Sequence, residues 1–404
     1  MSLRRHLGES YSPMYFLASL GAGGLSVSFF VYLLYMMPHK GSPIPTFNHM
    51  AAVFTGNDLV MQVFVGAAAL MMVLFGLLHY RLLVWNFMEF AAFRKTPAYE
   101  TLRSSNAEVQ LMAIPLTVAM AINVGFAMGA LFVPNLWEVR EVLFPFALVA
   151  FGATAVYAVL VFLEYFSRIL VTGHFDCEKN NSLAQMLSIF AFSMLSVGFA
   201  APGAMSHSKT VSGIGLMLAI TFASFAVLFG VVKIVLGFRA MFNHGVNKEA
   251  AVSLWIVIPI LTVLGIAFYR ISMGLHHNFG APSQPMEHAV MFMVIIALQI
   301  IFGLLGHEVL KRIGYYETFI RGEGKSVISY AAICPGVAFT VMGLFFINKG
   351  LVTGGMVDKF SITYFVLHLP LVYVQIKTIL VLLHLNGKLL RRETKEPDAA
   401  APAA

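Results

Sequence analysis

The first long apolar segment of the chain is residues 13–37, which read PMYFLASLGAGGLSVSFFVYLLYMM. It carries no charged side chain, and it exceeds the roughly 20 residues that an α-helix needs to cross the hydrocarbon core of a bilayer. Nine further segments of this kind follow in the 404-residue chain. We therefore predict an all-α membrane protein with ten transmembrane helices, near residues 13–37, 60–86, 109–133, 143–170, 183–203, 210–240, 250–271, 288–312, 326–348 and 360–386.

The composition argues against a water-soluble protein. Hydrophobic residues make up 59% of the chain and charged residues only 11%, whereas about a quarter of the residues of a soluble domain are charged. We expect a short amino-terminal segment (1–12), one membrane domain (13–386) and a carboxyl-terminal segment (387–404). The last residues, 393–404, are rich in Ala, Pro and charge, so we expect that part to be disordered.

The positions of the Lys and Arg residues predict the orientation in the membrane. These side chains resist translocation and therefore collect at the cytoplasmic ends of membrane helices. With the amino terminus inside, most of the 26 Lys and Arg residues fall on the inner face, and the outer face keeps only Lys40, Arg140, Lys209, Arg270, Lys349 and Lys359. We expect a multi-pass protein of the cell inner (cytoplasmic) membrane with both termini in the cytoplasm. The net charge of +7 then reflects topology, and no nucleic-acid partner is expected.

The ten predicted helices are of two kinds. The odd-numbered helices, which run outward, contain small residues, hydroxyl groups and prolines, and between their ends they carry no charged side chain. Three prolines at comparable depth predict kinks in these helices: Pro115, Pro259 and Pro335. The even-numbered helices carry the buried ionisable residues, which are His79, Glu164, Lys233, His307, Glu308, His368 and Lys377. We expect the acids and bases among them to form ion pairs near the cytoplasmic side, because an unpaired charge is costly in a bilayer.

Two interpretations fit the odd-numbered helices. Small residues allow close contact between membrane helices, whereas backbone groups freed by a proline need either protein or a water-filled cavity. We favour odd-numbered helices grouped around a central pore and keep close packing as the alternative. The candidate pore-lining residues are Gly24, Ser26, Thr117, Asn123, Ser196, Thr262 and Thr340.

Ten helices with both ends inside and an inner set of proline-containing helices resemble the SLAC/TehA superfamily of tellurite-resistance and dicarboxylate transporters. Residues 11–35, YSPMYFLASLGAGGLSVSFFVYLLY, followed by GSPIPTF at 41–47, are similar to its TsoY branch. The resemblance implies five helical hairpins with quasi-fivefold symmetry around a narrow pore, a homotrimer, and passage of small anions past a phenylalanine of the ninth helix. Phe339, near the middle of that helix, is the candidate gate.

The odd-numbered helices also restrict the substrate. A dicarboxylate would need Arg or Lys in a dry site, and we expect no such residue at mid-membrane in these helices. A small monovalent anion or a neutral weak acid is therefore favoured. The main prediction is a lipid-embedded channel or transporter for small anions, gated by an aromatic side chain, and not an enzyme.

Two alternatives involve chemistry at particular side chains. Cys334 precedes Pro335 in an apolar helix, and the similarity to the TsoY branch, some of whose members contain selenocysteine, implies redox or sulfur chemistry at a cysteine; Cys177 is the other candidate. Buried cysteines are usually inert. His79 and His307, in the similar segments FGLLHY and FGLLGHEVL, could ligate haem or a metal. We favour structural roles for both histidines and expect no cofactor.

Overall fold

The computed structural model describes residues 3–173, 175–176, 180–282 and 285–392. Within these residues all regular elements are helices, and the one β contact is an isolated bridge between Leu3 and Arg391. Ten helical segments are long and apolar enough to cross a membrane, as predicted: Pro13–Met36, Leu59–Phe93, Asn106–Phe132, Leu136–Thr172, Ala184–Met205, Lys209–His244, Ala251–Phe279, Met286–Arg312, Val327–Val352 and Ile362–Leu390. The chain is thus a multi-pass membrane protein.

The ten spans fall into a buried set and an exposed set. In their most apolar windows, 50–89% of the residues are buried in the odd-numbered spans, against 28–33% in the even-numbered ones. The buried helices are α1 (Phe16–Met36), α5 (Ala113–Phe132), α7 (Leu187–Met205), α9 (Val257–Phe279) and α11 (Ile333–Phe345). The exposed helices are α3 (Leu59–Phe93), α6 (Arg140–Thr172), α8 (Lys209–His244), α10 (Pro285–Arg312) and α12 (Ile362–Leu390). Two short helices, α2 (Phe47–Thr55) and α4 (Pro97–Arg103), lie in connecting segments.

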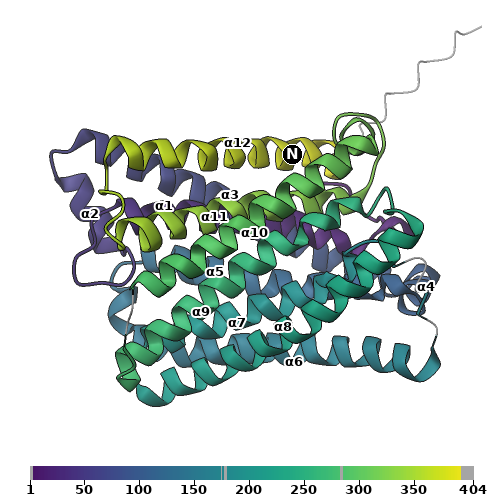
Figure 1. Cartoon of the computed structure of the whole chain (residues 1–404), viewed down its shortest axis with the longest axis horizontal. Coiled ribbons are helices and arrows are strands. Elements are labelled where there is room, and N and C mark those ends of the chain that lie inside the picture. Colours follow the sequence, from purple (N-terminus) through teal and green to yellow (C-terminus); the bar gives the residue numbers. More distant parts are fainter. Residues whose placement is uncertain (1–2, 174, 177–179, 283–284, 393–404) are drawn as a thin grey trace, which may run out of the picture.

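The five buried helices contact one another in a closed ring. α1 contacts α5, α5 contacts α7, α7 contacts α9, α9 contacts α11, and α11 contacts α1. Each exposed helix packs on two neighbours of this ring: α3 on α1 and α5, α6 on α5 and α7, α8 on α7 and α9, α10 on α9 and α11, and α12 on α11 and α1. In Figure 1 the long helices run side by side along the horizontal axis, with α12 at the top and α6 at the bottom.

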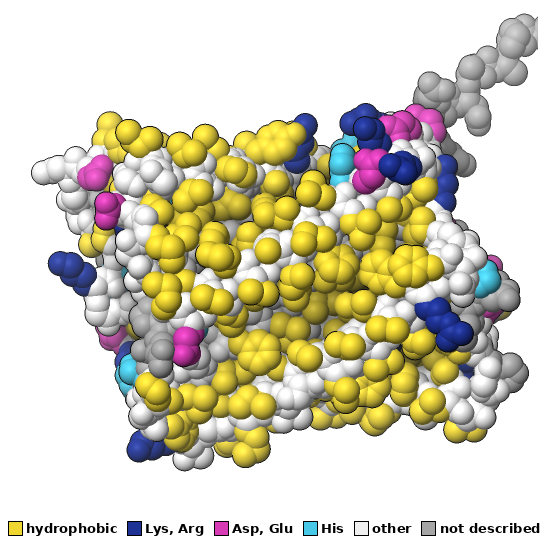
Figure 2. Space-filling model, in the orientation of Figure 1, with side chains coloured by type: hydrophobic (Ala, Val, Ile, Leu, Met, Phe, Trp, Pro, Cys, Tyr) yellow, Lys and Arg dark blue, Asp and Glu magenta, His cyan; other side chains and the backbone are white. Residues whose placement is uncertain are grey.

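The surface matches this arrangement. Hydrophobic side chains cover the middle of the face drawn in Figure 2, and charged side chains gather toward its left and right ends. The long axis of the helices therefore connects two polar ends through an apolar band, as expected for a protein that crosses a bilayer.

Each buried helix begins with a short segment of 3₁₀-helix. These segments are η2 (Pro13–Tyr15), η3 (Asn106–Met112), η5 (Ala184–Met186), η6 (Ala251–Ile256) and η8 (Val327–Ala332). Pro115, Pro259 and Pro335, at which we expected kinks, each occupy the third residue of the α-helix that follows. A proline in the first turn removes no hydrogen bond from the α-helix, because amides there have no partner within the helix. The three prolines therefore lie at the junction of two helical forms.

Both described ends of the chain lie on the same side of the molecule. The amide of Arg4 donates to the carbonyl of Leu390 at 2.9 Å, and the indole Nε1 of Trp85 donates to the carbonyl of Arg4 at 2.7 Å. The first residues are thus held against the ends of α3 and α12. The segment that we expected to begin at residue 387 still belongs to α12 as far as Leu390, and the tail predicted to be disordered, 393–404, lies outside the described residues.

Candidate functional site

Two cavities lie inside the ring of buried helices. The first, on the side of the chain ends, we call the proximal cavity; it has a volume of about 220 Å³, and polar residues such as Gln110, Asn180 and Ser253 border it. The second, farther from the chain ends, we call the distal cavity; its volume is also about 220 Å³, and its walls are mainly apolar. The two cavities are therefore of similar size but differ in polarity.

The two cavities share three bordering residues, Phe190 of α7, Pro259 of α9 and Cys334 of α11. All three lie in the first turn of their α-helices. Phe190 is 4% exposed and Cys334 is 9% exposed. We call these three residues the neck, because they border both cavities.

Three of the predicted pore-lining residues border the distal cavity: Gly24, Asn123 and Thr262. The Thr262 hydroxyl, however, already donates to the carbonyl of Ala338 at 3.0 Å and accepts from Nε2 of Gln299 at 2.7 Å. Its hydrogen-bonding capacity is therefore used within the protein, and it offers little to an ion in the cavity.

The other four candidates border neither cavity and have fully buried side chains: Ser26, Thr117, Ser196 and Thr340. Ser26 donates to a carbonyl of α3 and Ser196 to a carbonyl of α8, each at 2.8 Å. Thr340 contacts a carbonyl of α12 at 3.4 Å, and Thr117 donates within α5 at 2.7 Å. Three of these hydroxyls thus join a buried helix to its exposed neighbour, as polar side chains commonly do between membrane helices.

Phe339, the candidate gate, also borders neither cavity. Its neighbours Val337, Ala338 and Val341 face the distal cavity, and with 3.6 residues per turn Phe339 points to another side of α11. It is partly buried and packs at the edge of the core. The phenylalanine that lies between the cavities is Phe190, which the sequence analysis did not single out.

Arg270 borders the distal cavity. We predicted that its helix ends at residue 271 and placed this side chain on the outer face, but α9 continues to Phe279, so Arg270 lies within the span. The expectation that charged side chains occur only at the ends of the buried helices is therefore wrong for Arg270. A signal for the longer helix was present in the sequence, because Gly280, with a φ of +73°, is a glycine of the kind that ends helices.

Arg270 has no carboxylate partner in the described part of the chain. One nitrogen of its guanidinium, Nη1, donates to the carbonyl of Val197 on α7 at 3.0 Å, and no ion pair to Arg270 occurs among the described residues. A buried cation normally pairs with an acid or lines water. Here the side chain faces the cavity and brings a positive charge to its apolar walls.

Arg140, at the start of α6, is a second cation at the distal cavity. Its Nη1 donates to the carbonyl of Trp137 at 3.1 Å, and the guanidinium lies 5.4 Å from the Trp137 ring. The carboxylate of Glu141 is 3.9 Å from Nε, but that carboxylate also accepts from the hydroxyl of Ser206 and the amide of His207. The distal cavity therefore has net positive character.

The residues considered for chemistry do not form a shared site in the described residues. Cys334 belongs to the neck, and Cys177 lies outside the described residues. Nδ1 of His79 is 2.8 Å from the carbonyl of Ser19 inside the protein, whereas His307 is exposed on α10, 2.9 Å from the hydroxyl of Tyr316. No group of three or more His, Cys, Asp or Glu residues suitable for a metal occurs in the part of the chain that the structure describes. The two histidines thus have separate surroundings.

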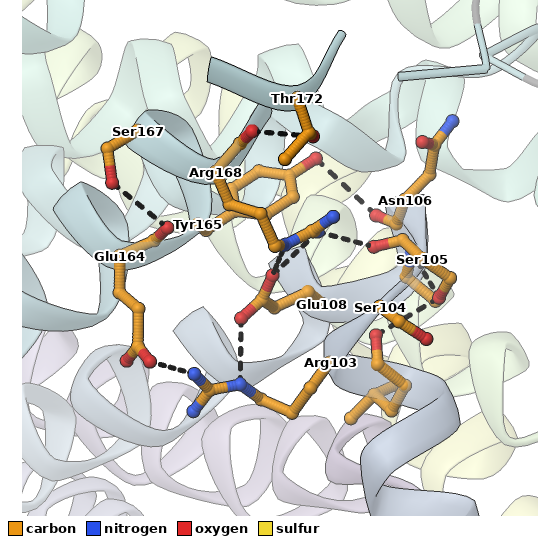
Figure 3. Close-up of polar contacts among 12 residues, drawn as sticks. Arg103, Ser104, Ser105, Asn106, Glu108, Glu164, Tyr165, Ser167, Arg168 and Thr172 are labelled. Carbon is orange, nitrogen blue, oxygen red and sulfur yellow. Dashed lines mark hydrogen bonds and ion pairs between the residues drawn. The ribbon is translucent and has the colours of Figure 1, made fainter. Parts of the chain in front are cut away.

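A network of charges lies near the proximal cavity and is drawn in Figure 3. Glu108, which is 2% exposed, accepts from Nε of Arg103 at 2.9 Å and from Nη2 and Nε of Arg168 at 2.7 and 3.0 Å. Arg103 also pairs with Glu164 of α6. These contacts, which we call the Glu108 network, attach η3 and α4 to α6 beside Gln110, a residue that borders the cavity.

The ionisable residues of the exposed helices pair differently from our expectation. Their acids contact arginines, since Glu164 pairs with Arg103 and Glu308 with Arg312 at 2.7 Å. Lys233 instead donates to the carbonyl of Gln185 at 3.1 Å. The expected ion pairs between Glu164 or Glu308 and Lys233 or Lys377 do not occur among the described residues, because arginines lie closer to both acids.

Neither a protein-family model nor a curated protein matches this chain. The cavities, the neck and the charges that surround them are therefore the features that bear on function. Of these features, the sequence identified the buried helices and two members of the neck, Pro259 and Cys334, but not Phe190 or the position of Arg270.

Proposed function

We propose that the protein is a channel or transporter that passes small anions through the ring of buried helices. The observation that carries this proposal is the pair of cavities that meet at the neck of Phe190, Pro259 and Cys334. A passage through the neck would join the two cavities into one path along the axis of the ring. Ten apolar helices are consistent with such a membrane transport protein.

The charges at the distal cavity favour anions over cations. Arg140 and Arg270 both border it, and apolar walls lower the local dielectric constant, so that each charge acts more strongly than it would in water. The cavity volume of about 220 Å³ suits an ion of a few atoms. Small monovalent anions are therefore the favoured substrate. The reasons are the size of the distal cavity and the two arginines that border it, and not an absence of cations as in the sequence analysis.

The resemblance to the SLAC/TehA superfamily supports the same proposal. A closed ring of five helices, each covered by an exposed helix and each entered through a 3₁₀ segment, is the arrangement that five hairpins with quasi-fivefold symmetry would produce. On this basis we propose a homotrimer in the cell inner membrane, with both chain ends and the proximal cavity in the cytoplasm. The excess of Lys and Arg on that side supports the orientation.

Phe190 is the proposed barrier at the neck. A hydrated anion that moves from the polar proximal cavity into the neck must lose water, and an apolar ring offers it no replacement. Rotation of this ring would widen the neck without moving a helix. The gate would then belong to α7 and not to α11, where the family resemblance places it.

Anion flux through purified protein in liposomes tests this proposal. We expect the wild type to pass chloride, nitrate, thiosulfate or formate selectively, and Phe190→Ala to raise the flux at least about tenfold, which corresponds to a barrier lowered by about 1.4 kcal/mol. Phe339→Ala is the matched control, because it removes the same ring from a residue that borders neither cavity.

Three other results would change the conclusion. Correctly folded wild type and Phe190→Ala that both pass no anion would exclude an anion pore. An increase in Phe339→Ala alone would return the gate to α11. Equal increases in both variants would show that flux responds to loosened packing and not to the neck.

A further inference from the structure

Arg270 has one edge of its guanidinium group free for a ligand. Nη1 donates to the carbonyl of Val197 at 3.0 Å, and no contact to Nε or Nη2 occurs among the described residues. Neither of these two nitrogens is among the polar side-chain atoms that are fully enclosed and lack a hydrogen-bond partner. Arg270 borders the distal cavity. These two nitrogens form the side of a guanidinium that binds two oxygens of one anion in parallel.

A second hydrogen-bond donor near Arg270 lacks a partner. The hydroxyl of Tyr35, on α1, is enclosed and makes no hydrogen bond in the described structure, and its residue is 6% exposed. The ring of Tyr35 packs edge-on against Phe345, with the ring centres 5.4 Å apart, and both Phe345 and Arg270 border the distal cavity. An enclosed hydroxyl without a partner is costly. Tyr35 does not itself border the cavity, and its role as a donor to an anion bound at Arg270 is part of the proposal below.

We propose that Arg270 is a binding site within the distal cavity for a monovalent oxyanion with two oxygens in one plane, such as nitrate or formate. The inference rests on the proposed function and adds the position and chemistry of the site. At Arg270 a single positive charge without a carboxylate partner matches a single negative charge, and Arg140, the other cation at the cavity, already has the carboxylate of Glu141 at 3.9 Å. A halide could not use both nitrogens of the free edge in parallel.

The surroundings of Arg270 also allow the anion to leave. Conduction requires sites that bind weakly enough to release the ion. The hydrogen bond to the carbonyl of Val197 on α7 holds the Arg270 side chain in place. No acid is needed for this, so no acid competes with the anion. Arg140 also attracts anions to the same cavity. Its guanidinium is less free than that of Arg270, because the carboxylate of Glu141 lies 3.9 Å away.

Direct binding of nitrate tests the site. Purified protein in detergent is titrated with sodium nitrate in exchange for sodium gluconate, so that the sodium concentration stays constant, and thermal stabilisation is followed. We expect a saturable stabilisation of the wild type and a loss of nitrate affinity of at least about tenfold in Arg270→Gln, since a charged hydrogen-bonded pair is lost. Arg140→Gln, the control at the same cavity, should change the affinity less than about fivefold.

Two further variants keep the test valid if Arg270→Gln does not fold. Arg270→Lys keeps the charge but not the two parallel donors, so we expect it to bind nitrate more weakly while its affinity for chloride is retained. Tyr35→Phe removes only the hydroxyl that has no partner, and we expect it to weaken nitrate binding. The proposal is overturned if Arg270→Gln, or failing that Arg270→Lys, binds nitrate as the wild type does.

Flux measurements on the same samples separate this inference from the proposed function. Nitrate flux in the wild type that is unchanged in folded Arg270→Gln would remove the site and leave the anion pore. Saturable nitrate binding that depends on Arg270, together with no anion flux, would keep the site and remove the transport function. Loss of both would remove both.

Discussion

We expect Glu108→Gln to destabilise the protein by about 3 kcal/mol, the lower end of the range for removing one partner of a buried ion pair. The carboxylate is 2% exposed and makes contacts of 2.9, 2.7 and 3.0 Å with the guanidinium groups of Arg103 and Arg168. Glutamine keeps the shape but not the charge. The lower end applies because the arginine side chains are 29% and 26% exposed, and Arg103 keeps Glu164 as a partner.

The assay is reversible unfolding of purified protein in mixed micelles with increasing sodium dodecyl sulfate, followed by circular dichroism. Glu308→Gln is the control, because its carboxylate makes the same kind of contact with Arg312, at 2.7 Å, but both side chains are more than half exposed. Solvent screens such a pair, so we expect no measurable loss of stability. If the two variants lose equal free energy, the reasoning from burial is refuted.

Three further predictions concern the neck and the contacts between helices. In a Cys177→Ser background, a small methanethiosulfonate reagent should block anion flux by modifying Cys334, which borders both cavities; flux that stays unchanged while mass spectrometry detects the adduct would remove the thiol from the path. Gly336→Ala should cost about 1–3 kcal/mol in the same unfolding assay, because the new methyl group would overlap the hydroxyl of Thr378. Ser196→Ala should lower the free energy of unfolding by about 0.6 kcal/mol, because the hydrogen bond to α8 is lost. We expect its ion selectivity to be unchanged, and altered selectivity would show that Ser196 lines the pore.

Some of the candidate site could be predicted from the sequence. Small and hydroxyl residues concentrate in the odd-numbered segments, and these are the helices that the structure buries. Gly24 and Asn123 border the distal cavity as expected. The same composition, however, serves two purposes, since Ser196 faces an exposed helix while Asn123 faces the cavity. Residue type alone does not separate these purposes, because a hydroxyl suits a helix contact as well as a pore.

By itself the sequence determined that the chain crosses a membrane ten times and that alternate helices differ in character, because hydrophobic length and composition are properties of each segment taken separately. The tertiary structure decided which face of each helix points inward. A membrane helix is apolar on every side, so its pattern of residues carries little information about its rotation. Packing in the ring therefore placed Phe190 between the cavities, turned Phe339 away from them and brought Arg270 to the distal cavity.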